Sequence, residues 1–185
     1  AASLASYLEL HIEQGPVLED LEIPVGIVTG IRGNLRVPKA RCVGEYSHCG
    51  GVPRSHRRDA AIAVSELVMG LDRIWDACEA RGQDFAFTVG KMATDAQRHA
   101  MTIIAGQVDF SVDMRSLDIA FMDEMEARIQ EMAMEIADKR RVRFDLGRFE
   151  SGSCRCIRRC ETCDGFLERG EALAIGFEEG GIVEA

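Results

Sequence analysis

A strict alternation of apolar and polar residues near the middle of the chain constrains the fold more than any other feature. From Gln107 to Arg115, in the second part of the stretch 102–115, apolar residues occupy every second position, namely Val108, Phe110, Val112 and Met114. The positions between them are polar or charged, and the last is Arg115. Successive side chains of a β-strand point to opposite faces of the sheet. The pattern therefore predicts one long strand over residues 102–115, with an apolar face and a polar face.

Two segments with helical periodicity flank this strand. The first runs from Asp59 to Arg81, and Gly82 follows where a left-handed cap would fall. The second follows Asp118, whose carboxylate can accept free amide N–H groups of a first helical turn. Its apolar residues recur at spacings of three and four, and they include Met122, Met125, Ile129, Met132 and Ile136. This methionine stripe fits an adaptable binding face or a helix core against a sheet, and we expect the core.

Shorter strands are predicted on either side of these elements, at residues 35–45, 85–89 and 142–146, whereas residues 48–58 form a loop rich in Gly, Pro and Arg. From residue 35 to 149 the order is strand, helix, strand, strand, helix, strand. We therefore predict an α+β fold, a ferredoxin-like βαββαβ domain whose four-stranded antiparallel sheet carries two helices on one face. Such a fold names no activity by itself.

The two ends of the chain have weaker patterns. Residues 4–22 indicate a short helical segment interrupted at Gly15-Pro16, and the run VGIVTGI after Pro24 indicates a buried strand. Near the other end, the run LERGEALAIGF, residues 167–177, is expected to form a helix.

Composition excludes some partners. A formal net charge of −9 repels a phosphate backbone, so we expect no nucleic acid partner. No stretch approaches the roughly 18 apolar residues that a membrane span needs, so we expect no membrane partner. The N-terminal residues lack the basic segment and cleavage site of a signal peptide, and we expect a cytoplasmic protein. A local basic run, Arg54, His56, Arg57 and Arg58, fits a solvated loop that leads into a helix.

The chain has 7 cysteines, and four of them crowd into the tail: Cys154, Cys156, Cys160 and Cys163. An odd total argues against a complete disulfide framework. The spacing leaves two interpretations, a structural zinc site with Cys160 and Cys163 among its ligands, or a divergent and partly disordered tail. The usual pair of C-x₂-C knuckles is missing, which favours the second interpretation.

The segment YLELHIEQGPVLE, residues 7–19, carries the most chemical information. His11 stands among Glu9, Glu13 and Gln14, ahead of a Gly-Pro turn. Neutral imidazole is a common ligand of Zn²⁺, and a nearby carboxylate can orient its other ring nitrogen. A lone histidine between apolar neighbours more often packs in a core, so this segment alone is a weak metal signal.

Four motifs, in this order, resemble the hydantoinase/carbamoylase branch of the M20 metallopeptidase-like family: ELHIEQGPVLE, IPVGIVTGIRG, GEYSHCGGVPRSHRRDAA and GQVDFSVDMRS. That branch includes N-carbamoyl-L-amino-acid hydrolases, allantoate amidohydrolases and β-ureidopropionases. The resemblance covers residues 4–150. It implies that residues 1–34 are a remnant of a catalytic metallohydrolase domain, that 35–150 form a lid and dimerisation domain, and that 151–185 are a divergent Cys-rich tail.

The resemblance also implies roles for individual residues. His11 would be one ligand of a two-metal centre, and Gln14 would contact substrate. His48 would be the catalytic lid histidine that reaches an active site across the dimer and steadies the developing oxyanion, a donor worth about 3 kcal/mol. Arg115 would bind the substrate carboxylate, because a guanidinium fork matches a carboxylate in bidentate geometry.

Without the resemblance, both lid residues have simpler interpretations. His48 would be a surface-loop histidine. Arg115 would form a salt bridge with Asp113 or Asp118, worth little if exposed.

The implied reaction is hydrolysis of a linear carbamoyl or ureido C–N bond, with two divalent metal ions, Zn, Mn or Co, activating a water and a glutamate acting as general base. We expect the remaining metal ligands and this glutamate outside residues 1–185. The chain is therefore predicted to be a fragment of a metal-dependent amidohydrolase, inactive alone and without a stably bound metal, and a homodimer through its lid domain. The alternative is a non-catalytic dimerisation or binding module of the same fold.

This chain departs from the family pattern at three places. Thr102 replaces the usual Asn, and Ala105 replaces the usual Pro. The usual H-A-G-T-T-P-M loop reads H-C-G-G-V-P-R from His48 to Arg54, so its hydroxyl groups are missing.

Overall fold

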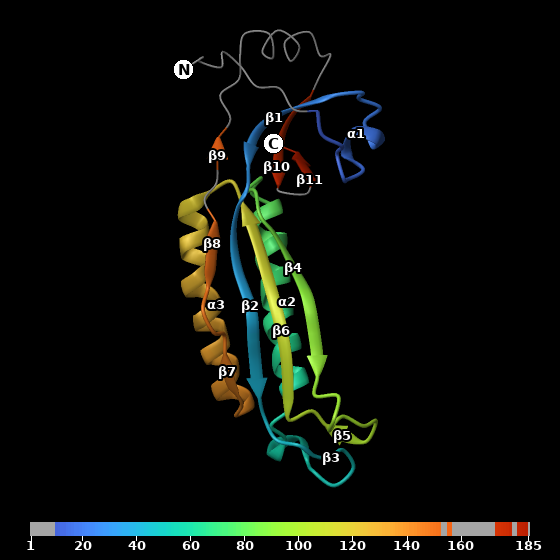
Figure 1. Ribbon diagram of the computed structural model, residues 1–185. Helices are drawn as coiled ribbons and strands as arrows, with labels where there is room; N and C mark the ends of the chain where they lie inside the picture. The colour runs from blue at the N-terminus through green and yellow to red at the C-terminus, as the bar shows by residue number, and fades with distance from the viewer. Residues whose placement is uncertain (1–9, 153–154, 157–172, 179–180, 185) are drawn as a thin grey trace, which may run out of the picture. The chain divides into compact units, whose positions relative to one another are not determined.

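The computed structural model describes residues 10–152, 155–156, 173–178 and 181–184. The chain divides into two compact units, one of residues 1–31 with 155–185 and a larger one of residues 32–154 (Figure 1). No helix in the described ranges is both long and apolar enough to cross a membrane.

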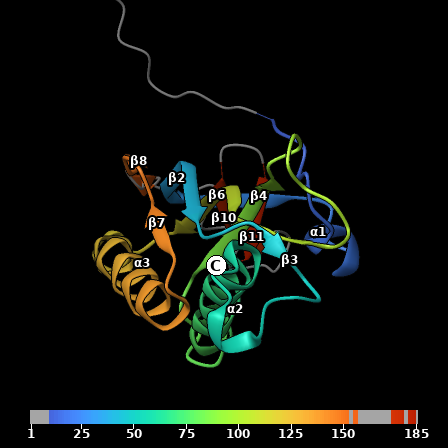
Figure 2. The ribbon, with the colours of Figure 1, turned by 90° about the horizontal axis from the view of Figure 1, so that it is seen from below.

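The larger unit is an antiparallel sheet with two helices on one face. Its main strands lie in the spatial order β4 (Ala86–Thr94), β6 (Gln107–Ser116), β2 (Gly33–Val43) and β7 (Arg143–Asp145). The helices α2 (Ala60–Glu79) and α3 (Ile119–Arg140) pack on the same side of these strands (Figure 2). The predicted α+β class with an antiparallel sheet is confirmed.

A fifth strand, β8 (Glu150–Gly152), joins the sheet because the edge position beside β2 is divided. β7 pairs with Arg41–Val43 and β8 with Asn34–Arg36. Pro38 lies between these two stretches and has no N–H to donate, and the register of β2 against β6 also shifts between Val37 and Ala40. The sheet therefore has five strands where the sequence pattern predicted four.

The core forms where the alternating pattern placed it. The four apolar residues of β6, from Val108 to Met114, are at most 2% exposed. Buried side chains of both helices cover them, among which are Val64, Leu67, Leu71, Met122, Met125 and Ile129. The expectation that the α3 methionines contribute to a helix core is confirmed for Met122 and Met125, whereas Met132 is half-buried at its margin.

Both helices begin at the residues that the sequence predicts, and α2 is followed by the predicted left-handed cap at Gly82. The Asp59 carboxylate accepts the N–H groups of Ala61 and Ile62, and Asp118 accepts that of Phe121. After α2, Gly82 adopts a φ of +63°, and the next N–H donates back to the Cys78 carbonyl at 2.9 Å. This is the left-handed helix ending that favours glycine.

The expected long strand over residues 102–115 is broken, which corrects the prediction. β5 (Ile103–Ile104) instead pairs with β3 (Ser47–His48), and β6 begins only at Gln107. The Ala105 carbonyl accepts the N–H of Ala60 at 2.9 Å. Gly106 lies so close to Tyr46 that a Cβ there would fall 2.3 Å from its ring. Because of these contacts with distant residues, the backbone of residues 105–106 leaves the hydrogen-bonding pattern of the sheet.

In the smaller unit a four-stranded sheet has the order β11 (Gly181–Glu184), β10 (Leu173–Glu178), β1 (Gly26–Ile31) and β9 (Arg155–Cys156). The strand predicted after Pro24 is therefore present as β1. Within the described part of residues 4–22, only α1 (Val17–Asp20), after the expected interruption at Gly15-Pro16, is helical, so the expected helical segment is wrong for residues 10–14. Gln14 there has a φ of +59°, which a right-handed helix does not allow.

The helix expected over residues 167–177 is also wrong where the structure describes it. Residues 173–178 form β10, which pairs parallel with β1. The order Leu, Ala, Ile, Gly, Phe from residue 173 alternates larger apolar with small residues, and Gly176 disfavours a helix interior. The two-residue alternation of residues 173–177 therefore favours a strand more strongly than the preceding residues favour a helix.

Candidate functional site

His48 lies at an exposed turn where the loop of residues 48–58 begins. Its Nδ1 accepts the N–H of Gly50 at 3.1 Å. A neutral imidazole that accepts at Nδ1 carries its proton on Nε2. The geometry therefore leaves Nε2–H as a directed donor, and it has no partner among the residues that the structure describes.

The loop that carries His48 is fixed by hydrogen bonds from several directions. The Cys49 N–H donates to the Thr102 carbonyl at 2.8 Å. The guanidinium of Arg57 donates to the carbonyls of Val52 and Cys49. Arg141, just after α3, donates to the carbonyl of Ser55. His48 is thus presented by a loop with little freedom, which suits a group that must act in one direction.

Arg115 lies on the polar face of β6 and forms the ion pair that its sequence allowed. Its Nε lies 3.1 Å from each oxygen of the Asp113 carboxylate, and its Nη2 lies 2.7 Å from Oδ2. Only 12% of the Arg115 side chain is exposed. Asp113 also lies 3.5 Å from Nε of Arg36. The guanidinium edge formed by Nε and Nη2 is therefore occupied, whereas Nη1 has no partner in the described ranges.

The structure does not bring His48 and Arg115 together within one copy of the chain. β6 starts near the β3–β5 pair and carries Arg115 near its far end (Figure 1). Arg115 lies eight positions after Gln107, and a strand rises about 3.3 Å per residue, so Arg115 is roughly 26 Å along the sheet from the start of β6, the end near which His48 lies. A small substrate cannot touch both from one copy.

The proposed metal and substrate residues of the smaller unit lie on an exposed segment. Nδ1 of His11 lies 2.6 Å from the carbonyl oxygen of its neighbour Ile12. Glu13 does not orient His11, because both its carboxylate oxygens accept the Leu18 N–H at the start of α1. Gln14 is exposed in a left-handed conformation.

Residues 10–152 and the described parts of the tail contain no group of three His, Cys, Asp or Glu side chains that could hold a metal ion. A catalytic zinc takes about three protein ligands. His11 therefore lies, within the described structure, among too few potential ligands to hold a catalytic metal ion.

The cysteines do not form a second candidate site in the part of the chain that is described. Cys42 and Cys78 are buried, and burial raises the pKa of the Cys42 thiol to about 12, which keeps it protonated. Cys154, Cys160 and Cys163 lie outside the described residues, and Cys156 belongs to β9. The zinc interpretation of the tail stays a prediction.

One buried ion pair near the Arg115 end of the sheet was not foreseen. Arg32 pairs with Asp84, and the Asp84 carboxylate also accepts the Leu117 N–H at 2.6 Å. The Ser116 hydroxyl donates to the Asp84 carbonyl at 2.7 Å. Together these bonds fix the turn from β6 into α3. The partners lie 52 positions apart in sequence, so no local pattern could have paired them.

Known proteins match this chain both in sequence and in structure, although no family model does. It is 34% identical over 154 residues to a protein of Arabidopsis thaliana named allantoate deiminase, covering 75% of this chain and 29% of that protein. It is 36% identical over 152 residues to an N-carbamoyl-L-amino acid amidohydrolase of Geobacillus stearothermophilus, covering 80% of this chain and 34% of that protein.

Among solved structures, a hydantoinase/carbamoylase family amidase of Burkholderia multivorans superposes with a TM-score of 0.73 at 26% identity. This match covers 92% of the present chain and 41% of the amidase. The chain thus spans about a third of the length of the curated relatives that it matches.

Proposed function

We propose that this chain, whose sequence and fold match the hydantoinase/carbamoylase branch of the M20 metallopeptidase-like family, is the lid and dimerisation part of a metal-dependent amidohydrolase. The bond cleaved is a linear carbamoyl or ureido C–N bond, in a substrate of the N-carbamoyl amino acid or allantoate type. The relatives that carry this proposal are themselves named for such substrates.

The larger unit is assigned as a ferredoxin-like lid domain. Its elements follow one another as β2, α2, β4, β6, α3 and β7, which is the βαββαβ order. Both helices pack on the same face of the sheet, and all its strand pairs are antiparallel. These features support the assignment, and β8 is an addition to the common pattern.

The observation that carries the proposal is the separation of His48, near the start of β6, from Arg115, which lies roughly 26 Å further along that strand. If both residues act on one small substrate, they must come from two copies of the chain. Homodimerisation through the lid is therefore part of the proposal. β4 forms an open edge of the sheet, and the N–H and C=O groups of an open edge can pair with a second copy.

Each residue has a distinct part in the reaction. When a water adds to the substrate carbonyl, negative charge grows on the carbonyl oxygen, and the Nε2–H of His48 donates to it. Such a donor is worth more in the transition state than in the ground state, so it raises kcat. Arg115 retains Nη1 for the substrate carboxylate while Asp113 holds its other edge.

Two divalent metal ions, Zn, Mn or Co, are proposed for the complete enzyme, with His11 as one ligand and Gln14 near the substrate. The described residues around His11 do not supply the other ligands. The steps assigned to this chain are therefore those of His48 and Arg115 alone, and we propose that it does not hydrolyse substrate without further ligands.

A non-catalytic dimerisation module is the second candidate. The observation that favours it is the Arg115–Asp113 pair, because this contact gives the arginine a structural role that needs no substrate. In this case Arg115 variants would change stability without changing binding of a carboxylate ligand.

Size-exclusion chromatography with light scattering tests the proposal, when metal content and hydrolysis are assayed on the same peak. We expect a mass of twice 20.4 kDa, less than one metal ion per chain, and no hydrolysis of N-carbamoyl amino acids or allantoate. A monomer with one zinc per chain would contradict the lid assignment and favour a zinc site in the cysteine tail.

A further inference from the structure

A hollow of about 760 Å³ lies beside the loop that carries His48, apart from Arg115. Its wall consists of the turn of residues 49–54, the first turn of α2, and Arg140 at the end of α3. Figure 2 shows this end of the sheet, with β3 and the first turn of α2 in view. The volume falls within the range of about 300–1,000 Å³ that small-molecule sites occupy.

The charged side chains around the hollow are mostly cationic. Arg54, Arg57 and Arg140 line it, and Asp59 is the one carboxylate among its lining residues. The Asp59 carboxylate is already bound, since its Oδ1 accepts the N–H groups of Ala61 and Ile62. Glu66 compensates the charge of Arg140, so Arg54 and Arg57 give a local excess of positive charge in a chain with a net charge of −9, and a concave wall concentrates its field.

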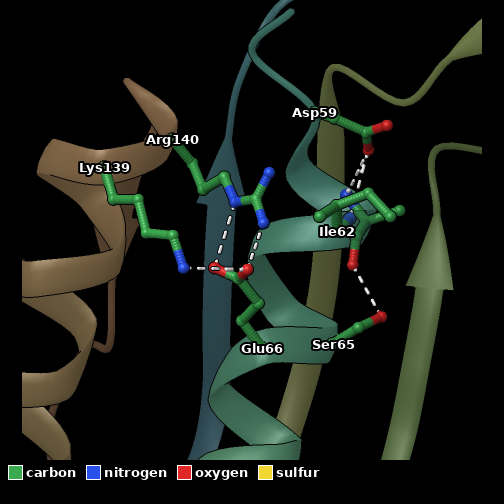
Figure 3. Close-up of polar contacts among 7 residues, drawn as sticks. Asp59, Ile62, Ser65, Glu66, Lys139 and Arg140 are labelled. Atoms are coloured by element: carbon green, nitrogen blue, oxygen red, sulfur yellow. Dashed lines mark hydrogen bonds and ion pairs between the residues drawn. The ribbon is translucent and has the colours of Figure 1, made fainter. Parts of the chain in front are cut away.

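The three guanidinium groups retain donors that point away from their existing partners. Arg57 uses Nε and Nη2 on the backbone carbonyls of Val52 and Cys49. Arg140 uses the same two nitrogens on Glu66, and its third nitrogen points away from that carboxylate (Figure 3). The Arg54 guanidinium makes no hydrogen bond or ion pair with the described part of the chain, although the Arg54 carbonyl accepts the Arg57 N–H at 3.3 Å. A guanidinium has five N–H donors, so each group can bind a further oxygen.

The donors come from the arginines and not from the end of the helix. The first N–H groups of α2 are all occupied, because Ala60 donates to the Ala105 carbonyl while Ala61, Ile62 and Ala63 donate to Asp59. An anion in the hollow would therefore be held by side-chain charge.

The wall is also fixed before any ligand arrives. Arg57 and Arg141 each bind backbone carbonyls of the loop, and Glu66 holds Arg140. A site whose arginines are already oriented loses less conformational entropy when it binds. Arg54 alone remains to be ordered.

We propose that this hollow binds an oxyanion of a small molecule, either a carboxylate or a phosphate group. Both offer two or more negatively charged oxygens that match guanidinium forks. Within one copy of the chain, the hollow lies at the opposite end of the sheet from Arg115, and its test does not depend on the amidohydrolase proposal. An anion bound there would lie beside the turn that presents His48.

Isothermal titration calorimetry on the whole chain tests this site, with inorganic phosphate and citrate as separate probes at a fixed ionic strength of about 0.15 M. We expect saturable binding of one ion per chain, and Arg54→Gln should weaken it at least about fivefold. Arg73→Gln is the matched control, because Arg73 is exposed on α2, eleven residues and about 16 Å beyond Ile62. That variant should bind as the parent does.

Binding of phosphate alone would assign the site to phosphates, and binding of citrate alone to carboxylates. Two results would overturn the proposal: no saturable heat with either probe up to about 10 mM, or equal affinity in Arg54→Gln and the parent chain. Circular dichroism of each variant shows that it is folded. Since the measurement needs neither a dimer nor hydrolysis, a chain that is monomeric and still binds the anion would end the lid proposal and leave this one standing.

Discussion

Charged side chains are paired with opposite charges at one end of the five-stranded sheet, whereas at the other end several donors have no partner in the described structure. At the end of β6 that carries Arg115, the arginine is 12% exposed and held by Asp113, and nearby Arg32 is buried against Asp84. At the other end, His48 and Arg54 are exposed, and the Nε2–H of His48 and the Arg54 guanidinium have no partner among the described residues. Compensated charge stabilises the fold, whereas uncompensated donors on a fixed loop are available to a ligand or a second molecule. Variants at the Arg115 end should therefore change mainly stability, whereas variants of His48 and Arg54 should change mainly catalysis or ligand binding.

The largest expected effect concerns His48. We place residues 32–154 of this chain into the Geobacillus stearothermophilus amidohydrolase in exchange for its matching segment. In that chimera, His48→Ala should lower kcat by about 100- to 1,000-fold with little change in KM, because its donor acts on charge that develops in the transition state. Steady-state kinetics with an N-carbamoyl amino acid measures both constants.

His56→Ala serves as the control for this variant. His56 is another exposed histidine of the same loop, and its Nδ1 lies 3.1 Å from the Ser55 hydroxyl. If His48→Ala and His56→Ala have the same kcat in the chimera, His48 has no special role in catalysis. The proposed contrast between the two ends of the sheet would then be wrong for its main residue.

The next effect is on stability, at the opposite end. Asp113→Asn removes the charge that faces Arg115, and a cation that is 12% exposed then lacks its partner. We expect the free energy of unfolding to fall by about 2 kcal/mol, less than for a fully buried pair because Asp113 itself is 34% exposed. Urea denaturation at pH 7 measures it. Asp109→Asn is the comparison, since its partner Arg41 is half exposed, and it should cost clearly less.

Much of this contrast follows from local sequence, and the rest does not. The alternation that placed Val108 and Phe110 in the core also placed Asp113 and Arg115 two residues apart on the polar face, where a pair was foreseen. Helix caps at Asp59 and Asp118 are equally local. Such features depend on a period or on neighbours within four residues.

The features that escaped prediction depend on distant contacts. The break before β6 arises where Gly106 meets Tyr46 and Ala105 meets Ala60, and the buried Arg32–Asp84 pair joins two separate strands' ends. The strand at 173–178 forms against β1, far away in sequence. For His48, the sequence indicates a loop histidine, but the bond from Gly50 that directs its proton outward is a matter of turn geometry.

A smaller effect on stability is expected at Glu66, whose carboxylate compensates the charge of Arg140 at the His48 end of the sheet. Glu66 on α2 binds Lys139 at 3.2 Å and also Arg140, which joins the two helices (Figure 3). The hydrogen bond from Arg140 lowers the pKa of Glu66 from 4.5 to about 2. Because the folded pKa is depressed, the stabilisation is fully present above the unfolded pKa and is lost as the pH falls toward 2.

Glu66→Gln should therefore lower the free energy of unfolding by about 1 kcal/mol at pH 7. The gap between this variant and the parent should narrow from pH 5 to pH 2, because the parent alone loses the carboxylate charge. Urea denaturation series at pH 7, 5, 3 and 2 give the comparison. A gap that does not depend on pH would mean that Glu66 acts through packing and not through its charge.

The smallest expected effect concerns Arg54, and it separates the two kinds of charge most directly. Arg54→Gln removes an exposed cation that has no partner in the described structure, so the free energy of unfolding should change by no more than about 0.5 kcal/mol. The same urea measurement that detects Asp113→Asn should detect almost nothing here. A loss above about 1 kcal/mol would show that Arg54 supports the loop, and its effect on anion binding would then be structural. If stability is unchanged while anion binding weakens, the arginine serves the ligand and not the fold, which is what an uncompensated charge on a fixed wall implies.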